Sequence, residues 1–302
     1  MNKDIYRRIC ETEGSRIPLF QQYWWMETVC AGKRWEVLLA REGDCVRGAW
    51  PYLCGSRMGL RYVLLPQLTM FGGPWLADSA DREALDSLVQ QFAELKPALC
   101  LQRLAPSVTS AKPFALLNCK VSRRSTYRFD LQRGVPELMA AASELRRRDY
   151  KRLDVQLHID TDIDATLFAD MHADYWRRRG KRDLVGRDLI VRVCTEAVGR
   201  GQGILTGARD GDGRLHAALF APYDQESAYL LLSAIGPEAP RNVMSYLIWK
   251  VLALIQDRTR WFDFEGGAEE GVGRYYRSFG AEKVEYLQLT RAANPLLAKL
   301  LK

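Results

Sequence analysis

Three strand-like runs in series constrain the fold of this chain most, because they predict an antiparallel meander. The runs are residues 204–208, 215–222 and 228–233, and short connectors of Asp and Gly or of Asp, Gln and Glu join them as in hairpins. Apolar periodicity then predicts a helix over about 244–258, and a short strand follows at 261–265. A meander followed by a helix and a strand indicates an α+β domain built in layers.

The rest of the chain supplies the same kinds of element. In the second half, Pro136 favours the start of a helix that runs to about residue 152. Further segments predicted there are a strand at 126–131, helices at 164–179 and 188–200, a short helix near Tyr275 and a last strand at 284–289. The first half is predicted to contain a hairpin of 35–40 with 45–52, a strand at 61–65, a helix at 81–95 and a strand at 98–104.

Length and composition are those of a folded protein with room for two domains. The chain has 302 residues, of which 47% are hydrophobic and 27% charged, and disordered chains have fewer apolar residues. We predict domains 1–122 and 123–302, with the last strand and tail able to pack back on the first domain. No apolar run reaches the roughly 20 residues of a membrane span, and the N-terminus lacks the apolar stretch of a secretory signal, so we expect a cytoplasmic protein without integral membrane contact.

Cysteine and histidine usage predicts free thiols and no metal. The seven cysteines are scattered without a CxxC pair, and the three histidines, His158, His172 and His216, are far apart.

The net charge of +7 is concentrated in clusters. Such clusters attract polyanions, but they also serve simply to solvate helix faces, and the sequence leaves both interpretations open. The clusters are Arg123 and Arg124; Arg146, Arg147, Arg148, Lys151 and Arg152; and Arg177, Arg178, Arg179, Lys181 and Arg182.

The segment WFDFEGG, residues 261–267, carries the candidate chemistry. Strand alternation predicts that Asp263 and Glu265 share one face, with α-carbons about 6.6 Å apart. Each carboxylate would then raise the proton affinity of the other, which prepares a general base. The alternative is that both pair with the abundant arginines. Farther on, Gly280 suits the left-handed position that closes a short helix.

The same segments resemble a known family. FDFEGG followed by YYRSFGA at 275–281 resembles the C-terminal part of FemAB-like acyltransferases of the GNAT superfamily. The resemblance continues in IPLFQQ with Trp24 and Trp25, in PQLTMFGGPW at 66–75, in GRLHAALF at 213–220 and in SAYLLLS at 227–233, so it covers most of the chain. It implies tandem GNAT-like (acyl-CoA N-acyltransferase) domains with mixed central sheets flanked by helices. It also implies transfer of an acyl group from acyl-CoA, or of an aminoacyl group from aminoacyl-tRNA, to an amine.

The resemblance also implies roles for particular residues. Asp263 or Glu265 would act as the base or position the amine, Arg277 would stabilise an oxyanion or an anionic substrate, and Tyr276 would present its phenol. Donor-binding positions fall on a strand and at a helix start: Leu231, Leu232, Ser233, Arg241, Asn242, Val243, Met244 and Ser245.

Two departures from the family pattern favour an alternative function. The donor loop from Pro240 to Ser245 has no glycine, and Arg277 stands where Fem enzymes have a lysine. The alternative is therefore a catalytically inactive module that binds an anionic partner such as tRNA or an envelope precursor. Trp75, Trp176 and Tyr223 are candidate contacts for the acceptor amine.

Overall fold

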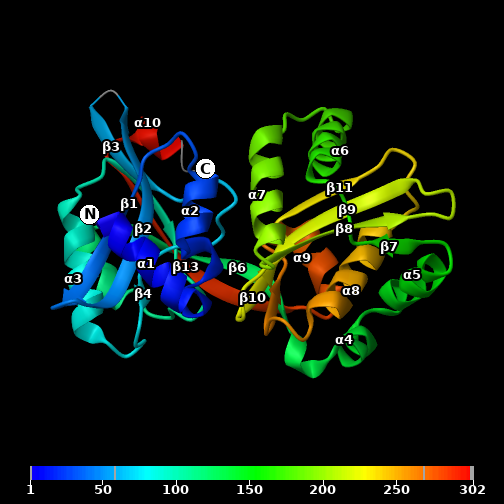
Figure 1. The fold of residues 1–302 in the computed structure, drawn as a ribbon, viewed down its shortest axis with the longest axis horizontal. Coiled ribbons are helices and arrows are strands. Elements are labelled where there is room, and N and C mark those ends of the chain that lie inside the picture. The colour runs from blue at the N-terminus through cyan, green and yellow to red at the C-terminus, as the bar shows by residue number, and fades with distance from the viewer. Residues whose placement is uncertain (1, 58, 268, 300–302) are drawn as a thin grey trace. The chain divides into compact units, whose positions relative to one another are not determined.

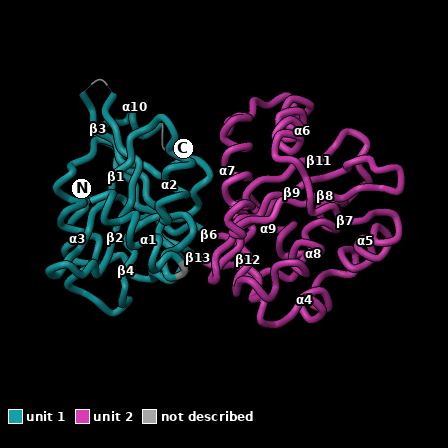
Figure 2. Tube along the Cα trace, in the orientation of Figure 1, with its two compact units in different colours: residues 1–124, 285–302 teal, residues 125–284 magenta. Residues whose placement is uncertain are grey.

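The computed structural model describes residues 2–57, 59–267 and 269–299. The chain forms two compact units, residues 1–124 with 285–302 and residues 125–284 (Figure 2). It passes from unit 1 to unit 2 within β6 (Lys120–Asp130) and returns within β13 (Glu282–Ala292). Mixed sheets with flanking helices confirm the predicted fold class. Among the described residues, no helix combines the length and apolar character needed to cross a membrane.

Unit 1 is built on a sheet whose strands lie in the order β1–β2–β3–β5–β13. The predicted hairpin is confirmed, with Glu42 opposite Cys45 at its turn, and β3 and β5 are parallel. Asp81 caps the N-terminus of helix α3, because its side chain accepts a hydrogen bond from the Ala84 amide at 2.9 Å. The strands are β1 (Trp35–Glu42), β2 (Cys45–Arg57), β3 (Leu60–Leu64), β4 (Trp75–Leu76) and β5 (Leu99–Arg103), and the helices are α1 (Asn2–Glu13), α2 (Tyr23–Val29), α3 (Arg82–Glu94) and α10 (Pro295–Ala298).

Unit 2 contains the predicted meander. β8 (Gly203–Arg209), β9 (Leu215–Pro222) and β11 (Leu232–Ile235) pair antiparallel, and β7 (His158–Asp160) lies beside β8. A second group of strands lies in the order β6–β12–β10, with β12 at Trp261–Asp263 and β10 at Ser227–Tyr229. Helices α6 (Ala165–Arg178) and α7 (Arg187–Gly199) lie on one side of the meander and α8 (Val243–Ile255) on the other (Figure 1).

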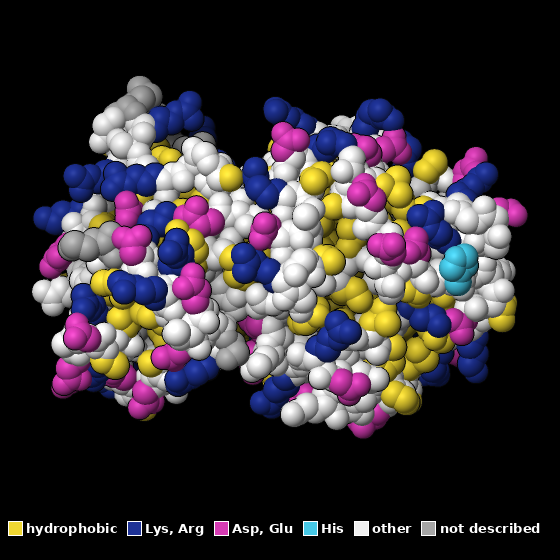
Figure 3. All heavy atoms as spheres, in the orientation of Figure 1, with side chains coloured by type: hydrophobic (Ala, Val, Ile, Leu, Met, Phe, Trp, Pro, Cys, Tyr) yellow, Lys and Arg dark blue, Asp and Glu magenta, His cyan; other side chains and the backbone are white. Residues whose placement is uncertain are grey.

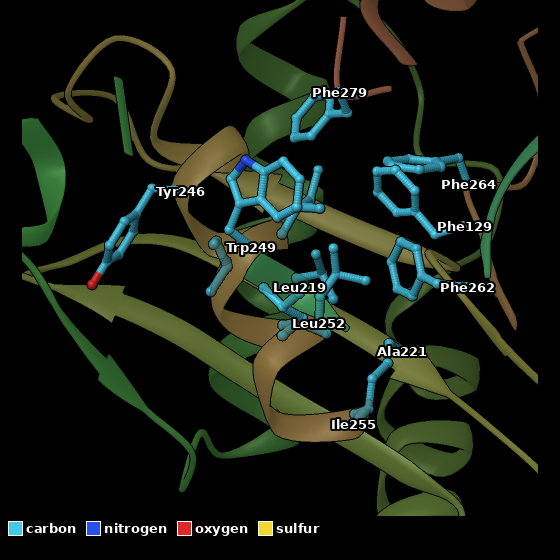
Figure 4. Close-up of a cluster of buried hydrophobic side chains, with 14 of the residues drawn as sticks. Phe129, Leu219, Ala221, Tyr246, Trp249, Leu252, Ile255, Phe262, Phe264 and Phe279 are labelled. Carbon is cyan, nitrogen blue, oxygen red and sulfur yellow. The ribbon is translucent and has the colours of Figure 1, made fainter. Parts of the chain in front are cut away.

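Alternation along β9 explains why helices cover both faces of the meander. Leu219 and Ala221 point to the α8 side, where they meet Trp249, Leu252 and Ile255 in a buried cluster (Figure 4). Four phenylalanines close this cluster: Phe129, Phe262, Phe264 and Phe279. Burial of this many apolar side chains fixes the position of α8, and with it the start of that helix.

The prediction of one continuous helix up to about residue 152 is wrong. The segment expected as one helix over 136–152 is two, α4 (Val135–Ala141) and α5 (Glu144–Asp154), because Ala142 and Ser143 are extended. The Ser143 amide donates to the Ser278 carbonyl at 2.9 Å, and Gly280 approaches Ala141 so closely that a Cβ on it would lie 3.2 Å from the Ala141 carbonyl oxygen. A contact far away in sequence therefore replaces the helical hydrogen bonds at this point.

Candidate functional site

The candidate site lies in unit 2, where its strands diverge. The predicted strand 228–233 is interrupted at Leu230 and Leu231, so that β10 pairs in parallel with β12 whereas β11 pairs with β9. The Leu230 amide still bonds to the Asp263 carbonyl at 2.8 Å, but the Leu231 amide turns to the Phe220 carbonyl at 3.2 Å. The two strand systems therefore separate just beyond the C-terminal ends of β10 and β12.

Asp263 lies at this end of β12 and is fully buried. Its carboxylate accepts hydrogen bonds from Thr126 Oγ1 at 2.5 Å, Arg128 Nε at 2.6 Å and the Glu265 amide at 2.8 Å. Thr126 and Arg128 are two residues apart on β6, so strand alternation places them on the same face. The buried carboxylate is thus paired and satisfied.

The prediction that Asp263 and Glu265 share a strand face is wrong. β12 ends at Asp263, and Glu265 has a φ of +55°, which takes the backbone out of the strand conformation. The bond from the Glu265 amide to the Asp263 side chain holds this turn, and the Gly266 amide adds a bond to Thr126 Oγ1 at 3.2 Å. Glu265 is half-buried where Asp263 is enclosed, so the two carboxylates have different environments.

Helix α9 (Glu270–Arg277) brings the other two predicted catalytic residues to this turn. The Tyr276 ring packs on Phe264, with ring centroids 4.5 Å apart. Burial raises the pKa of Tyr276 to about 12, and the neighbouring Tyr275, Glu265 and Asp263 act in the same direction. Tyr276 is consequently a neutral phenol, able to donate a hydrogen bond, at any physiological pH.

Arg277 follows Tyr276 and is exposed. Its Nη1 donates to the Tyr127 hydroxyl at 2.5 Å. Gly280, with a φ of +87°, takes the left-handed conformation predicted for the end of this helix.

At the start of α8, the predicted donor-binding residues meet a buried carboxylate. Asn242 has a φ of +66°, and its Nδ2 donates to Asp149 Oδ2 at 2.8 Å. Asp149, on α5, also lies 3.8 Å from Arg146 Nη1 and 3.7 Å from Arg152 Nη2. Arg152 donates to the Arg241 carbonyl at 2.9 Å, and the Arg241 side chain is exposed.

The other predicted donor positions differ in accessibility. Ser245 is buried and bonds to Arg146 Nη1 at 2.7 Å and to the Tyr275 hydroxyl at 3.1 Å, so it faces α5 and α9. Val243 is also buried, in the hydrophobic cluster that α8 shares with the meander. Met244 and Ser233 are half-buried, and Leu231 and Leu232 are buried at the strand break.

Sequence reasoning missed Thr126, Tyr127, Arg128 and Asp149. The alternation of Thr126 and Arg128 was a usable signal, since both are polar and lie on one face of a predicted strand. Asp149 stood inside a run dominated by arginines, where nothing marked it as buried.

The residues of the basic clusters differ in burial. Arg146 is buried and engaged with Ser245 and Ser278, whereas Arg148, Lys151 and Arg152 are exposed. The cluster at 177–182 is exposed, although Arg177 and Arg178 both pair with Asp174. Acidic side chains lie among the basic ones on the face drawn in Figure 3.

The three aromatic residues suggested as acceptor contacts have partners of their own. Trp75 Nε1 donates to the Arg16 carbonyl at 3.0 Å, and Trp176 Nε1 donates to His172 Nε2 at 3.1 Å. The Tyr223 hydroxyl accepts a bond from Arg258 Nη1 at 2.9 Å. Across the described part of the chain, no three His, Cys, Asp or Glu side chains gather as metal ligands would.

Comparisons with known proteins agree with this geometry. Residues 140–277 match the model of the acetyltransferase (GNAT) domain family. The crystal structure of FemX is similar at a TM-score of 0.72 and 11% identity, covering 99% of this chain and 97% of that chain. The C-terminal domain of a protein named as a lysylphosphatidylglycerol synthetase from Agrobacterium fabrum is similar at a TM-score of 0.62 and 15% identity, covering 100% and 96%.

A tandem GNAT protein from the clavulanic acid biosynthesis pathway is similar at a TM-score of 0.55 and 14% identity, covering 97% of this chain and 95% of that chain. Comparison with curated protein sequences gave no significant match. The chain therefore has a FemAB-like fold of the GNAT superfamily, and residues 140–277 match the acetyltransferase domain of that superfamily.

Proposed function

We propose that this protein is an N-acyltransferase that moves an acyl or aminoacyl group from acyl-CoA or aminoacyl-tRNA to an amine. The observation that carries the proposal is the divergence of β10 and β11 beside the end of β12. It leaves strand ends next to Glu265, Tyr276 and Arg277, where a donor's reactive carbonyl group and an amine can be held together. The match of residues 140–277 to a GNAT domain supports the same chemistry.

The environments of the two carboxylates suggest a division of roles. Asp263 is buried under three hydrogen bonds, so we assign it to holding the turn as a positioning residue. Glu265 is half-buried, so we assign it to receiving the proton of the attacking amine. The neutral phenol of Tyr276 would donate to the leaving group, and Arg277 would stabilise the negative charge that develops on the carbonyl oxygen.

The start of α8 supports aminoacyl-tRNA over acyl-CoA as the donor. The pyrophosphate of a CoA donor is favoured where backbone amides and a helix N-terminus are open to an anion. Here the Asp149 carboxylate bonds to Asn242 at that helix start and already brings a negative charge. The exposed side chains of Arg148, Lys151, Arg152 and Arg241 around it suit the more dispersed phosphates of a nucleic acid.

The second candidate is the inactive module that binds an anionic partner. The observation that favours it is the full burial of Asp263, which removes one of the two predicted bases from solvent. Such a module would bind tRNA or an anionic envelope precursor and transfer nothing.

The test measures transfer from labelled aminoacyl-tRNA and from acetyl-CoA to a panel of amines. We expect transfer from aminoacyl-tRNA, a loss of about 10²-fold or more in Glu265→Gln, and unchanged rates in the control Glu270→Gln, whose carboxylate is exposed and paired with Arg274. Binding of tRNA should weaken steeply with salt, because several phosphates are neutralised. Transfer from acetyl-CoA alone would overturn the donor assignment, and salt-dependent tRNA binding without transfer from either donor would favour the inactive module.

A further inference from the structure

Unit 1 contains a cavity of about 230 Å³ that the proposed transfer reaction does not use. Three segments line it: the C-terminal end of α3 with the residues that follow, the 3-10 helix η3 (Lys112–Leu117) with the two residues after it, and the end of β13. All of them belong to unit 1, whereas Glu265, Tyr276 and Arg277 belong to unit 2. The cavity is therefore separate from the candidate site.

Most of the cavity wall is apolar. The Phe92 ring is stacked on Trp50 in the core of unit 1, with ring centroids 4.2 Å apart, and Leu117 and Pro97 are also buried. The neighbouring Leu116 leaves 57% of its surface exposed. An exposed leucine beside buried apolar side chains offers a surface that the apolar part of a ligand would cover favourably.

Two cationic side chains, Lys96 and Arg291, line the same cavity, and none of the described residues of its wall is acidic. Lys96 is exposed and Arg291 is half-buried. In the described part of the chain, neither has a carboxylate partner or a side-chain hydrogen bond, whereas Arg47 of the same unit pairs with Asp81 at 2.6 Å. Two positive charges without a counter-charge favour an anionic ligand, which can accept charge-assisted hydrogen bonds from both.

The backbone conformation of Lys96 allows its charge to be tested without damage to the fold. Its φ of +45° is in the left-handed region, which favours glycine because a Cβ is strained there. Asn118, on the same wall, has a φ of +50°, but asparagine tolerates this conformation. Substitution of Lys96 by glycine therefore removes the charge and relieves the backbone at the same time.

We propose that this cavity binds a small monocarboxylate with an apolar body, whose carboxylate lies between Lys96 and Arg291 and whose apolar part contacts Phe92 and Leu117. An apolar cavity of about 150 Å³ holds a benzene molecule. A cavity of about 230 Å³ therefore has room for a ring and a short arm that carries one carboxylate. The planar guanidinium of Arg291 matches the two oxygens of a carboxylate. The proposal holds whether or not the chain transfers acyl groups.

Isothermal titration of the full chain with phenylacetate tests this binding. We expect a Kd of about 1 mM or lower, which suits a ligand of this size, and an affinity that falls as the salt concentration rises. The neutral phenylacetamide has nearly the same shape without the charge, so it should bind about tenfold more weakly or worse. Sodium sulfate supplies charge without an apolar part and should also bind more weakly. No binding of phenylacetate, or equal affinity for phenylacetamide or sulfate, would overturn the proposal.

Cys119 provides a second readout at the site, because it lines the cavity and is half-buried. Alkylation by iodoacetamide is followed by mass on two tryptic peptides, 104–120 with Cys119 and 42–47 with the exposed Cys45. Phenylacetate at about ten times its Kd should slow alkylation of Cys119 about tenfold, because only the free protein reacts. Alkylation of Cys45 should not change. Equal slowing of both thiols would place the ligand outside this cavity and overturn the assignment.

Variants test the two cations. Lys96→Gly and Arg291→Gln should each weaken phenylacetate binding about tenfold and change phenylacetamide binding little. Lys96→Gly should not lower the thermal midpoint, because glycine suits the left-handed backbone, so its loss of binding is not a loss of fold. The control Lys33→Gly removes an exposed lysine of unit 1 that does not line the cavity, and it should bind like the native chain. Native affinity for phenylacetate in either cavity variant would overturn the proposal.

Discussion

Asp263 and Glu265 are only two positions apart in the sequence, yet one carboxylate is buried and the other is half-buried. The contacts and backbone conformation of the individual residues explain this difference. Asp263 is the last residue of β12 and is enclosed by Thr126 and Arg128. Glu265 leaves the strand because its φ is positive. Pairing stabilises the buried charge of Asp263, whereas Glu265 lies beyond the turn and is half-buried, which is why we propose it as the proton acceptor.

Gly267 tests how tightly this turn is packed. It has a φ of +109°, and a Cβ added there would lie 2.6 Å from the Tyr127 ring. We expect Gly267→Ala to lower the free energy of unfolding by about 2 kcal/mol or more, through backbone strain and overlap with that ring. Urea unfolding of the native chain and the variant measures this change in the free energy of unfolding.

The matched control is Gly271→Ala on the neighbouring helix α9, where no atom lies within 4 Å of an added Cβ. Alanine in a helix is favoured over glycine by about 0.5–1 kcal/mol, so the control should be neutral or stabilising. Equal effects of the two substitutions would show that the Tyr127 contact does not constrain the turn.

At the scale of elements, three helices meet through one side chain. Arg146 of α5 donates to Ser245 of α8 and to Ser278 at the end of α9. Its guanidinium lies 4.7 Å from the Tyr275 ring centroid and 3.8 Å from Asp149. These contacts hold the start of α8 against α5 and explain why a run of arginines contains one that is buried.

Arg146→Ala should therefore be strongly destabilising. It would leave Asp149 as a buried charge without one of its cationic partners, a change that costs about 3–5 kcal/mol in buried ion pairs. The control Arg148→Ala changes an exposed arginine of the same helix, and we expect an effect within about 0.5 kcal/mol. Unfolding of the two variants in guanidinium chloride measures both losses of stability. Similar midpoints would show that Arg146 does not hold the three helices together.

At the scale of the whole molecule, the chain forms two compact units, and each unit has its own hydrophobic core. Unit 1 encloses several titratable groups whose neutral forms are favoured by burial. Burial raises the pKa of the Cys10 thiol to about 11 from an ordinary value of 9.0, with the Tyr23 amide bond opposing it.

Alkaline pH should for this reason weaken unit 1. The unfolded thiol ionises near pH 9 and the folded thiol near pH 11. The contribution of Cys10 is therefore complete below about pH 9 and is lost as the pH rises toward 11, by about 1 kcal/mol at pH 10. Stability compared between pH 8 and pH 10 should fall less in Cys10→Ala than in the native chain. The exposed Cys45→Ala should follow the native chain, and a fall in Cys10→Ala as large as in the native chain would contradict this origin.

The sequence by itself determined the kinds of element and most of their positions. The meander, the helices expected to begin at residues 81 and 164 and the left-handed Gly280 follow from periodicity and local conformational preference, which act within a few residues. Only the tertiary structure decided where segments break: at Ala142 and Ser143, at Leu230 and Leu231, and after Asp263. In the first two cases backbone amides bond to distant carbonyls, and in the third the turn rests on the partners of a buried carboxylate. Such partners are set by packing between distant segments, which local patterns do not encode.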